Sequence, residues 1–154
     1  MNLNIIPFES RYSKRFKELN VAWLDKYFYV EPKDTILLDN CEANIIDKGG
    51  FIFFAQYLEN IVGCFALIKL QNNEYELGKM AVDPNYQGLK IGQALLDSAI
   101  DHAKQNGWNK LILYSNTKLE NALYIYKKYG FIEVEIEKNL PYARSDIKME
   151  LLII

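Results

Sequence analysis

Histidine and paired cysteines are scarce in this sequence, and their scarcity argues against the usual protein metal sites. The chain has one histidine, His102, and two cysteines, Cys41 and Cys64, which share no Cys-x-x-Cys spacing. A structural zinc site normally takes four ligands from cysteine and histidine at short spacings. We therefore expect no metal, and we expect two reduced thiols, as in a cytoplasmic protein.

The sequence also lacks an excess of positive charge and any long apolar run. It has 18 lysines and arginines against 20 aspartates and glutamates, a net charge of −2. A nucleic-acid-binding surface normally carries a basic excess, so no nucleic-acid partner is expected. No window approaches the roughly eighteen apolar residues of a membrane span, and the first residues do not resemble a signal peptide. These absences predict a soluble, cytoplasmic protein without a membrane partner.

The sequence does have enough apolar material for one folded domain over residues 1–154, because 50% of its residues are hydrophobic and 14% aromatic. Its apolar spacing predicts an α/β chain in the order β-α-α-β-β-β-α-β-α-β-β. The expected strands are 2–8, 51–58, 61–70, 74–82, 110–114, 131–137 and 147–153. The expected helices are 10–29, Pro32 to the Gly49-Gly50 pair, 91 to Gly107, and the capping box Thr117-x-x-Glu120 to Gly130.

The most informative segment runs from Tyr86 to Leu96, where a strand passes through a glycine-containing loop into a helix. Amides of such a loop and the positive end of the helix dipole together bind a pyrophosphate. The nucleotide P-loop and the Gly-x-Gly-x-x-Gly dinucleotide pattern are both absent. The segment therefore predicts a site for another phosphorylated cofactor, and a plain strand-to-helix turn is the alternative.

The pattern in this loop is Gln87-x-x-Lys90-x-Gly92, preceded by Val82-Asp83-Pro84. It resembles the coenzyme A loop of the GNAT acetyltransferases, with Lys90 where the family usually has glycine. The element order is also that of the GNAT fold, a mixed central sheet of six to seven strands flanked by about four helices. The resemblance implies acetyl-CoA as cosubstrate, bound by Met80, Ala81, Val82, Gln87, Gly88, Leu89, Lys90, Ile91, Gly92, Gln93, Asn116, Asn121 and Tyr126.

A second motif, Asn121 to Phe131, resembles the later GNAT block that ends in Gly-Phe. Tyr126 lies four residues before Gly130, where the family's tyrosine usually lies. The resemblance implies that its hydroxyl protonates the departing thiolate, since the reference pKa values of a thiol and a tyrosine are about 8.5 and 10. The alternative is a core aromatic residue with its hydroxyl at the surface.

Glu76 is the candidate base, because it lies eleven residues before Gln87, as the catalytic glutamate does in histone-type members of the family. A lysine-like amine has a pKa of about 10.4, so a nearby carboxylate helps to remove its proton at neutral pH. Glu74 points to the same face of the strand and competes for this role. The alternative is that both glutamates are solvent-facing charges on the strand with no part in catalysis.

Other polar residues have two open interpretations. Asn116 is either a cofactor or substrate contact or a turn residue before a helix. Arg144 and Asp146 either recognise the acceptor or pair within a hairpin loop. Lys90 either strains a turn that needs a positive φ or adds a cation near the pyrophosphate. Trp23, on the first helix, belongs to an aromatic cluster that forms either core or pocket wall.

The sequence thus predicts an N-acetyltransferase that moves an acetyl group from acetyl-CoA to a primary amine in a ternary complex. A non-catalytic acyl-CoA sensor or interaction module on the same fold is the alternative. The acceptor is expected to be a small-molecule or peptide amine. A homodimer through the apolar C-terminal strand remains open, because core burial explains that strand equally well.

Overall fold

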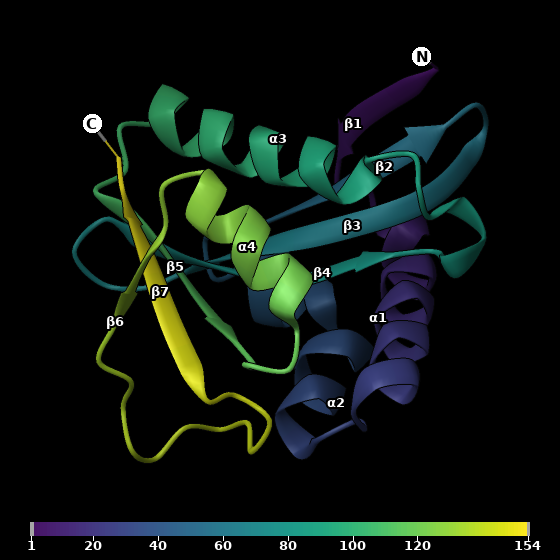
Figure 1. The fold of residues 1–154 in the computed structure, drawn as a ribbon. Coiled ribbons are helices and arrows are strands. Elements are labelled where there is room, and N and C mark those ends of the chain that lie inside the picture. The colour runs from purple at the N-terminus through teal and green to yellow at the C-terminus, as the bar shows by residue number, and fades with distance from the viewer. Residues whose placement is uncertain (1, 154) are drawn as a thin grey trace.

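The computed structural model describes residues 2–153, which form a seven-stranded mixed sheet in the order β1-β2-β3-β4-β5-β7-β6 (Figure 1). Within these residues β4 and β5 pair in parallel and all other neighbours are antiparallel. The strands are β1 (Leu3–Pro7), β2 (Phe51–Tyr57), β3 (Asn60–Lys69), β4 (Glu74–Val82), β5 (Lys110–Ser115), β6 (Ile132–Val134) and β7 (Ile147–Leu152). The helices are α1 (Ser13–Tyr27), α2 (Pro32–Asp39), α3 (Ile91–Gln105) and α4 (Glu120–Lys128), with short 3₁₀ helices η1 (Ser10–Tyr12) and η3 (Pro84–Tyr86) and a π-helical segment η2 (Glu42–Ile46). This confirms the predicted GNAT fold.

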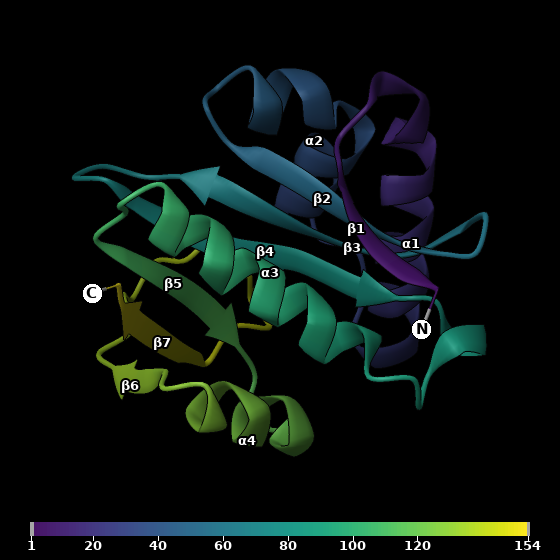
Figure 2. The ribbon, with the colours of Figure 1, turned by 90° about the horizontal axis from the view of Figure 1, so that it is seen from above.

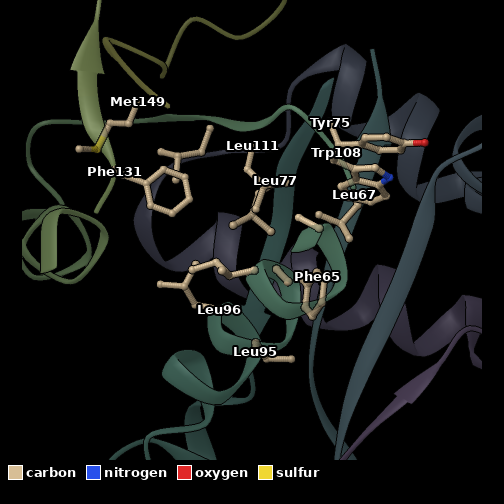
Figure 3. Packing of buried hydrophobic residues seen from close by; sticks show 14 of the residues in the cluster. Phe65, Leu67, Tyr75, Leu77, Leu95, Leu96, Trp108, Leu111, Phe131 and Met149 are labelled. Atoms are coloured by element: carbon tan, nitrogen blue, oxygen red, sulfur yellow. The ribbon is translucent and has the colours of Figure 1, made fainter. Parts of the chain in front are cut away.

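Helices cover the sheet from both sides and create two hydrophobic cores (Figure 2). One core contains Leu95 and Leu96 of α3 together with Phe65 and Leu77 of the sheet (Figure 3). The other core lies under α1 and α2 and includes Phe16. None of the helices between residues 2 and 153 is long and apolar enough to span a membrane.

The alternation of β4 decides which of its side chains can do chemistry. Tyr75 and Leu77 are buried in the α3 core, so Glu74 and Glu76 point to the other face of the sheet. The ring of Tyr75 stacks on Trp108 with 3.5 Å between centroids, which fixes the start of β4 beside the start of β5 (Figure 3).

A β-bulge interrupts β4 at Lys79 and Met80. Ala81 pairs with Cys64 and Gly78 pairs with Ala66, so two residues of β4 stand opposite one residue of β3. Lys79 accordingly has a left-handed φ of 54°. β4 pairs with β5 only over Glu74–Glu76, and beyond that point the two strands separate (Figure 2). The separation opens the space between them that becomes the site.

Some predicted element boundaries were wrong. The second helix was expected to reach Gly49, but α2 ends at Asp39, where Asn40 leaves the helical region and the Asn44 side-chain amide donates to the Ile36 carbonyl at 3.0 Å. After this break η2 continues as a separate π-helical segment. The expected strand 131–137 forms only over the three residues of β6. The first helix is shorter than 10–29, since η1 precedes it as a separate turn.

The capping box predicted at Thr117 was also wrong. The amide and the hydroxyl of Thr117 both donate to the carboxylate of Asp146, each at 2.8 Å. α4 therefore begins only at Glu120, with Leu119 as its N-cap and no side-chain cap. The threonine ties two loops together instead of starting a helix.

Candidate active site

A cleft of about 620 Å³ lies where β4 and β5 separate. Its walls are the second half of β4, the first turn of α3, the end of β5, α4 and the C-terminal half of α1. A side pocket of about 70 Å³ adjoins the cleft at Gly78 and Lys79 and contains Glu76. The site is thus built by elements from both halves of the chain around one gap in the sheet.

The anion loop, residues 87–93, lines one end of the cleft. None of its main-chain amides donates a hydrogen bond to a residue within the described chain, and the next amide to do so is that of Ala94. A Cβ built at Gly88 or Gly92 would meet nothing within 4 Å, so open space lies above both glycines. Exposed amides at the start of the fifteen-residue α3 are suited to hold a pyrophosphate.

Lys90 occupies a left-handed position in this loop, with a φ of 59°, and is the N-cap of α3. Glycine adopts this conformation without strain, whereas a side chain at Cβ costs on the order of 1 kcal/mol. The backbone therefore supports the first interpretation of Lys90, in which a lysine at the family's glycine position strains a turn that needs a positive φ. Lys90 still supplies a main-chain amide, as any residue except proline does, and this amide donates no hydrogen bond to a described residue.

Most of the residues predicted to bind the cofactor line the cleft: Met80, Ala81, Val82, Gln87, Gly88, Lys90, Ile91, Gly92, Gln93, Asn116, Asn121 and Tyr126. The side chain of Leu89 does not line it, and packs instead against the core beneath α3. Of Leu89, only the main-chain amide is therefore placed to bind the cofactor as predicted.

Tyr126 reaches the cleft from α4, with its ring 5.9 Å from that of Phe131. Its hydroxyl makes no hydrogen bond to any residue that the structure describes. Burial raises the pKa of Tyr126, so the hydroxyl remains protonated at neutral pH and is available as a donor.

Glu76 stands beside Gly78 on β4, and a Cβ at Gly78 would meet a carboxylate oxygen of Glu76 at 3.5 Å. The missing side chain at Gly78 thus leaves the carboxylate open toward the cleft. Burial raises the pKa of Glu76, although the charge of Lys79 opposes this shift. Within the described chain Glu76 has no hydrogen bond and no ion pair, whereas Glu74 lies 3.8 Å from the Lys110 ammonium.

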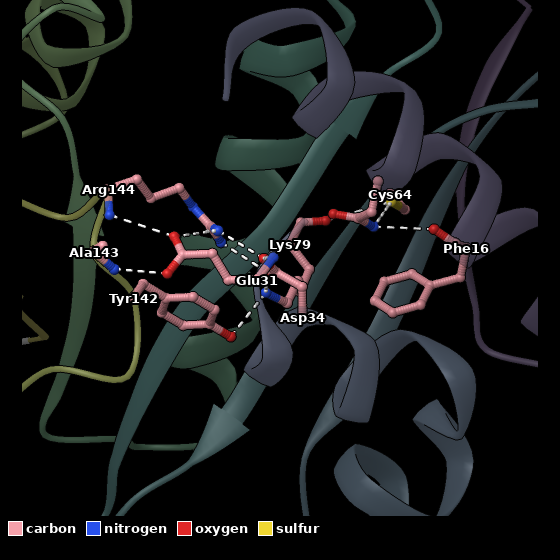
Figure 4. A network of polar contacts seen from close by, with 9 residues as sticks. Phe16, Glu31, Asp34, Cys64, Lys79, Tyr142, Ala143 and Arg144 are labelled. Carbon is pink, nitrogen blue, oxygen red and sulfur yellow. Dashed lines mark hydrogen bonds and ion pairs between the residues drawn. The ribbon is translucent and has the colours of Figure 1, made fainter. Parts of the chain in front are cut away.

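A buried polar network closes the cleft at the side of α2 and the β6–β7 loop (Figure 4). Asp34 is fully buried and accepts hydrogen bonds from Lys79 Nζ at 2.6 Å and from Arg144 Nη1 and Nη2 at 2.7 and 2.8 Å. Burial would raise the pKa of Asp34, but these hydrogen bonds outweigh it and lower the pKa to about 2. Asp34 is therefore ionised and holds the bulge of β4 to the β6–β7 loop.

Glu31 extends this network from the N-cap of α2. It accepts the amide of Ala143 at 2.7 Å and lies 3.2 Å from Arg144 Nη1. The Tyr142 ring lies 4.5 Å from the Lys79 ammonium and 4.3 Å from the Arg144 guanidinium (Figure 4). Sequence reasoning missed Asp34 and Lys79 as site residues, and the one signal for Asp34 was the Glu31-Pro32-x-Asp34 capping pattern.

These contacts bear on two of the open interpretations. Arg144 and Asp146 are engaged in pairing, although their partners come from α2 and from Thr117 instead of their own loop. Asn116 is a turn residue, because its amide donates to the Arg144 carbonyl at 2.7 Å and its oxygen accepts from Lys118 N. It still borders the cleft.

The chain also matches known proteins. The model of the acetyltransferase (GNAT) family matches residues 12–131. This chain belongs to the GNAT family. An uncharacterized N-acetyltransferase of Methanocaldococcus jannaschii is 28% identical over 131 residues, which are 85% of this GNAT chain and 53% of that protein. The ribosomal protein bS18-alanine N-acetyltransferase of Escherichia coli is 32% identical over 92 residues, 60% of this chain and 62% of that enzyme.

A crystal structure of a GNAT-family acetyltransferase from Staphylococcus aureus Mu50 superposes with a TM-score of 0.86 at 28% identity and covers 99% of both chains. The GNAT chain described here spans about half to three fifths of the length of the two sequence relatives above. Fold and sequence together thus establish that the chain is a member of the family.

Proposed function

We propose that this chain is an N-acetyltransferase that uses acetyl-CoA to acetylate a primary amine by direct attack in a ternary complex. The observation that carries the proposal is the anion loop, residues 87–93, whose amides face open space at the end of a cleft that also contains Tyr126 and adjoins Glu76. Membership of the GNAT family supports the same reaction class.

The residues of the cleft fit coenzyme A. The amides of the anion loop and the dipole of α3 would hold the pyrophosphate, since they are otherwise unused within the described chain. Main-chain groups of Met80, Ala81 and Val82 lie beyond the end of the β4–β5 pairing, so they remain available to the pantetheine arm. Acetyl-CoA, when bound, supplies an acetyl group activated as a thioester.

Glu76 would take the proton of the acceptor amine. An amine with a pKa of about 10.4 is mostly protonated at pH 7, and this costs the reaction roughly 4–5 kcal/mol. A carboxylate whose pKa is raised toward neutrality by burial is a better base than an exposed one. Because Gly78 has no side chain between the cleft and Glu76, the amine can reach that carboxylate directly or through a water molecule.

Tyr126 would give its proton to the leaving thiolate. Burial raises the pKa of this hydroxyl, and the same environment raises that of a thiol, so the cost of the transfer stays small. Neither cysteine of the chain is suited to carry the acetyl group, because both are buried and burial raises the pKa of Cys64 to about 12. Direct attack by the amine is therefore the simpler route.

A thiol-release assay tests this proposal. Purified protein is incubated with acetyl-CoA and a panel of primary amines, and free coenzyme A is measured together with the mass of each amine. We expect at least one amine to gain an acetyl group with matching thiol release, and Tyr126→Phe to reduce turnover while acetyl-CoA still binds. Acetyl-CoA binding without acetylation of any amine, or equal turnover by Tyr126→Phe, would contradict the proposed reaction.

A further inference from the structure

An aromatic wall borders the end of the cleft away from the anion loop. It is formed by Trp23, Tyr27 and Phe28, which α1 presents to the cleft together with Leu24. The Trp23 ring lies 5.3 Å from that of Tyr27 and 5.7 Å from that of Phe28, so the three rings make one continuous apolar surface. A bound molecule with an apolar body would bury that body against it.

The charges of the buried polar network at this end balance one another. Asp34 is neutralised by Lys79 and Arg144, and Glu31 is paired with Arg144. Glu76 is the remaining carboxylate, and within the described chain it has no ion-pair partner. A polyamine carries several ammonium groups that each require an anion, whereas this end of the cleft offers one.

The loops around this end are tied to one another. Lys118 donates to the Tyr27 carbonyl at 2.9 Å, and its ammonium lies 4.1 Å from the centre of the Phe28 ring. Asn116 and Thr117 bind the segment 144–146, and Glu31 binds the amide of Ala143. The carbonyls of Tyr27 and Arg144 and the amides of Thr117 and Ala143 are therefore already engaged and do not offer themselves to an extended peptide.

We infer that the acceptor is a compact amine with a single positive charge and an apolar, aromatic body. This inference rests on the proposed acetyl transfer and adds its substrate class. The aromatic wall takes the body of the acceptor, Glu76 takes the proton of its amine, and the tied loops exclude an extended peptide. Polyamines are disfavoured, because their additional ammonium groups would find no unpaired carboxylate among the network residues at this end of the cleft.

A competition between three acceptors tests the inference. The probes are 2-phenylethylamine, spermidine and a hexapeptide with a free N-terminal alanine, each assayed for kcat/KM with saturating acetyl-CoA. We expect 2-phenylethylamine to exceed the other two by about 10-fold or more. A higher kcat/KM for spermidine or for the peptide would overturn the inference.

Two variants of the aromatic wall test whether the acceptor binds at this wall. Trp23→Ala and Tyr27→Leu should each raise the KM for 2-phenylethylamine by about 10- to 100-fold and change kcat less. Tyr29→Ala is the matched control, because this aromatic residue lies just after α1 but is 59% exposed and does not line the cleft. An unchanged KM in both wall variants would overturn the role of the wall.

Calorimetry with acetyl-CoA separates this inference from the reaction on which it rests. If every variant binds acetyl-CoA like the wild type, the wall variants are folded and their KM values report on the acceptor. If the wild type binds acetyl-CoA but leaves 2-phenylethylamine unacetylated while another probe reacts, the substrate class is wrong and the proposed reaction stands. If the wild type does not bind acetyl-CoA, the proposed function itself is wrong.

Discussion

Glu76 differs from the other carboxylates at this end of the cleft in having no partner within the described chain. Asp34 and Glu31 are bound by lysine, arginine and main-chain donors, and these bonds hold both carboxylates in place. Glu76 instead stands in a small pocket where burial raises its pKa. A half-buried carboxylate without a partner lowers the stability of the folded chain, so its presence is explained best by use in proton transfer.

The Glu76→Gln variant should lose about 100-fold or more in kcat/KM, because the amide takes up no proton. In the wild type, kcat/KM should fall as the pH drops through the raised pKa of Glu76, since the carboxylate form is lost there. This acidic limb should be missing in the variant. The measurement is a pH profile of kcat/KM for both proteins.

The matched control for this profile is Glu74→Gln. Glu74 lies on the same strand and face, but Lys110 neutralises it. Its replacement should leave both the acidic limb and the rate at neutral pH close to those of the wild type. An acidic limb that survives in Glu76→Gln, or that disappears in Glu74→Gln, would assign the base elsewhere.

For Tyr126, we expect the Tyr126→Phe variant to lower kcat by about 10- to 100-fold, since the ring remains while the proton donor is lost. The dissociation constant for acetyl-CoA should not change. Tyr124→Phe is the control, because Tyr124 lies on the same helix but is 67% exposed. Equal kcat values for the two variants would show that the Tyr126 hydroxyl has no part in the reaction.

At the scale of elements, α2, the bulge of β4 and the β6–β7 loop are joined through Asp34. Removing one partner of a buried ion pair leaves the other charges uncompensated, so Asp34→Asn should lower the free energy of unfolding by about 3–5 kcal/mol. Asp39→Asn is the control on the same helix: its carboxylate pairs with Lys17 where both are half exposed, and its loss should cost under about 1 kcal/mol. Urea titrations of both variants give these values.

The same network gives stability a defined pH dependence. The pKa of Asp34 is about 2 in the folded chain and 3.8 for the free side chain, so its contribution is complete above pH 4 and is lost as the pH falls toward 2. The shift corresponds to roughly 2.5 kcal/mol. The wild type should lose this amount between pH 4 and 2 relative to Asp34→Asn, and an identical acid dependence of the two would contradict the network's role.

The anion loop makes a prediction that depends on its backbone. Lys90→Gly should change the dissociation constant for acetyl-CoA by less than about 3-fold, because glycine adopts the same φ and supplies the same amide. Lys90→Pro should weaken binding by more than about 10-fold, because proline fixes φ near −65° and has no N–H. Calorimetric titration measures both. Equal binding by the two variants would show that the loop amides do not hold the cofactor.

Local patterns predicted the elements well and their contacts poorly. Alternation and helical spacing predicted all seven strands and four helices, because these periods come from burial on one face. The break at Asn40 and the role of Thr117 could not be predicted, since the first involves a side-chain bond from Asn44 to Ile36 and the second two bonds to the distant Asp146. The bond from Arg144 to Asp34 spans 110 residues and leaves no periodic trace in the sequence.

The bulge of β4 is a further feature that the sequence hides. Lys79 has a positive φ although it is neither glycine nor asparagine, so the sequence contains no turn-forming residue that would predict the bulge. The anion loop was predicted because its glycines and helix start stand together in sequence. Glu76 and Tyr126 were predicted through the family resemblance, whereas the aromatic wall was left open between core and pocket.

At the scale of the whole molecule, the site exists because one parallel pair of strands separates. β4 and β5 stay paired for three residues and then diverge, and both halves of the chain contribute walls to the resulting cleft. The two cores on opposite faces of the sheet hold this open arrangement, with α1 on one side and α3 and α4 on the other (Figure 2). Cofactor and acceptor would therefore meet across the gap in the sheet.

The most direct test of this account is a calorimetric titration of the protein with acetyl-CoA, desulfo-CoA and ATP. ATP shares a pyrophosphate with coenzyme A but lacks the pantetheine arm that the free edge of β4 would bind. The account predicts micromolar dissociation constants for the two coenzyme A species and much weaker binding of ATP. No binding of either coenzyme A species, or binding of ATP as tight as theirs, would contradict it.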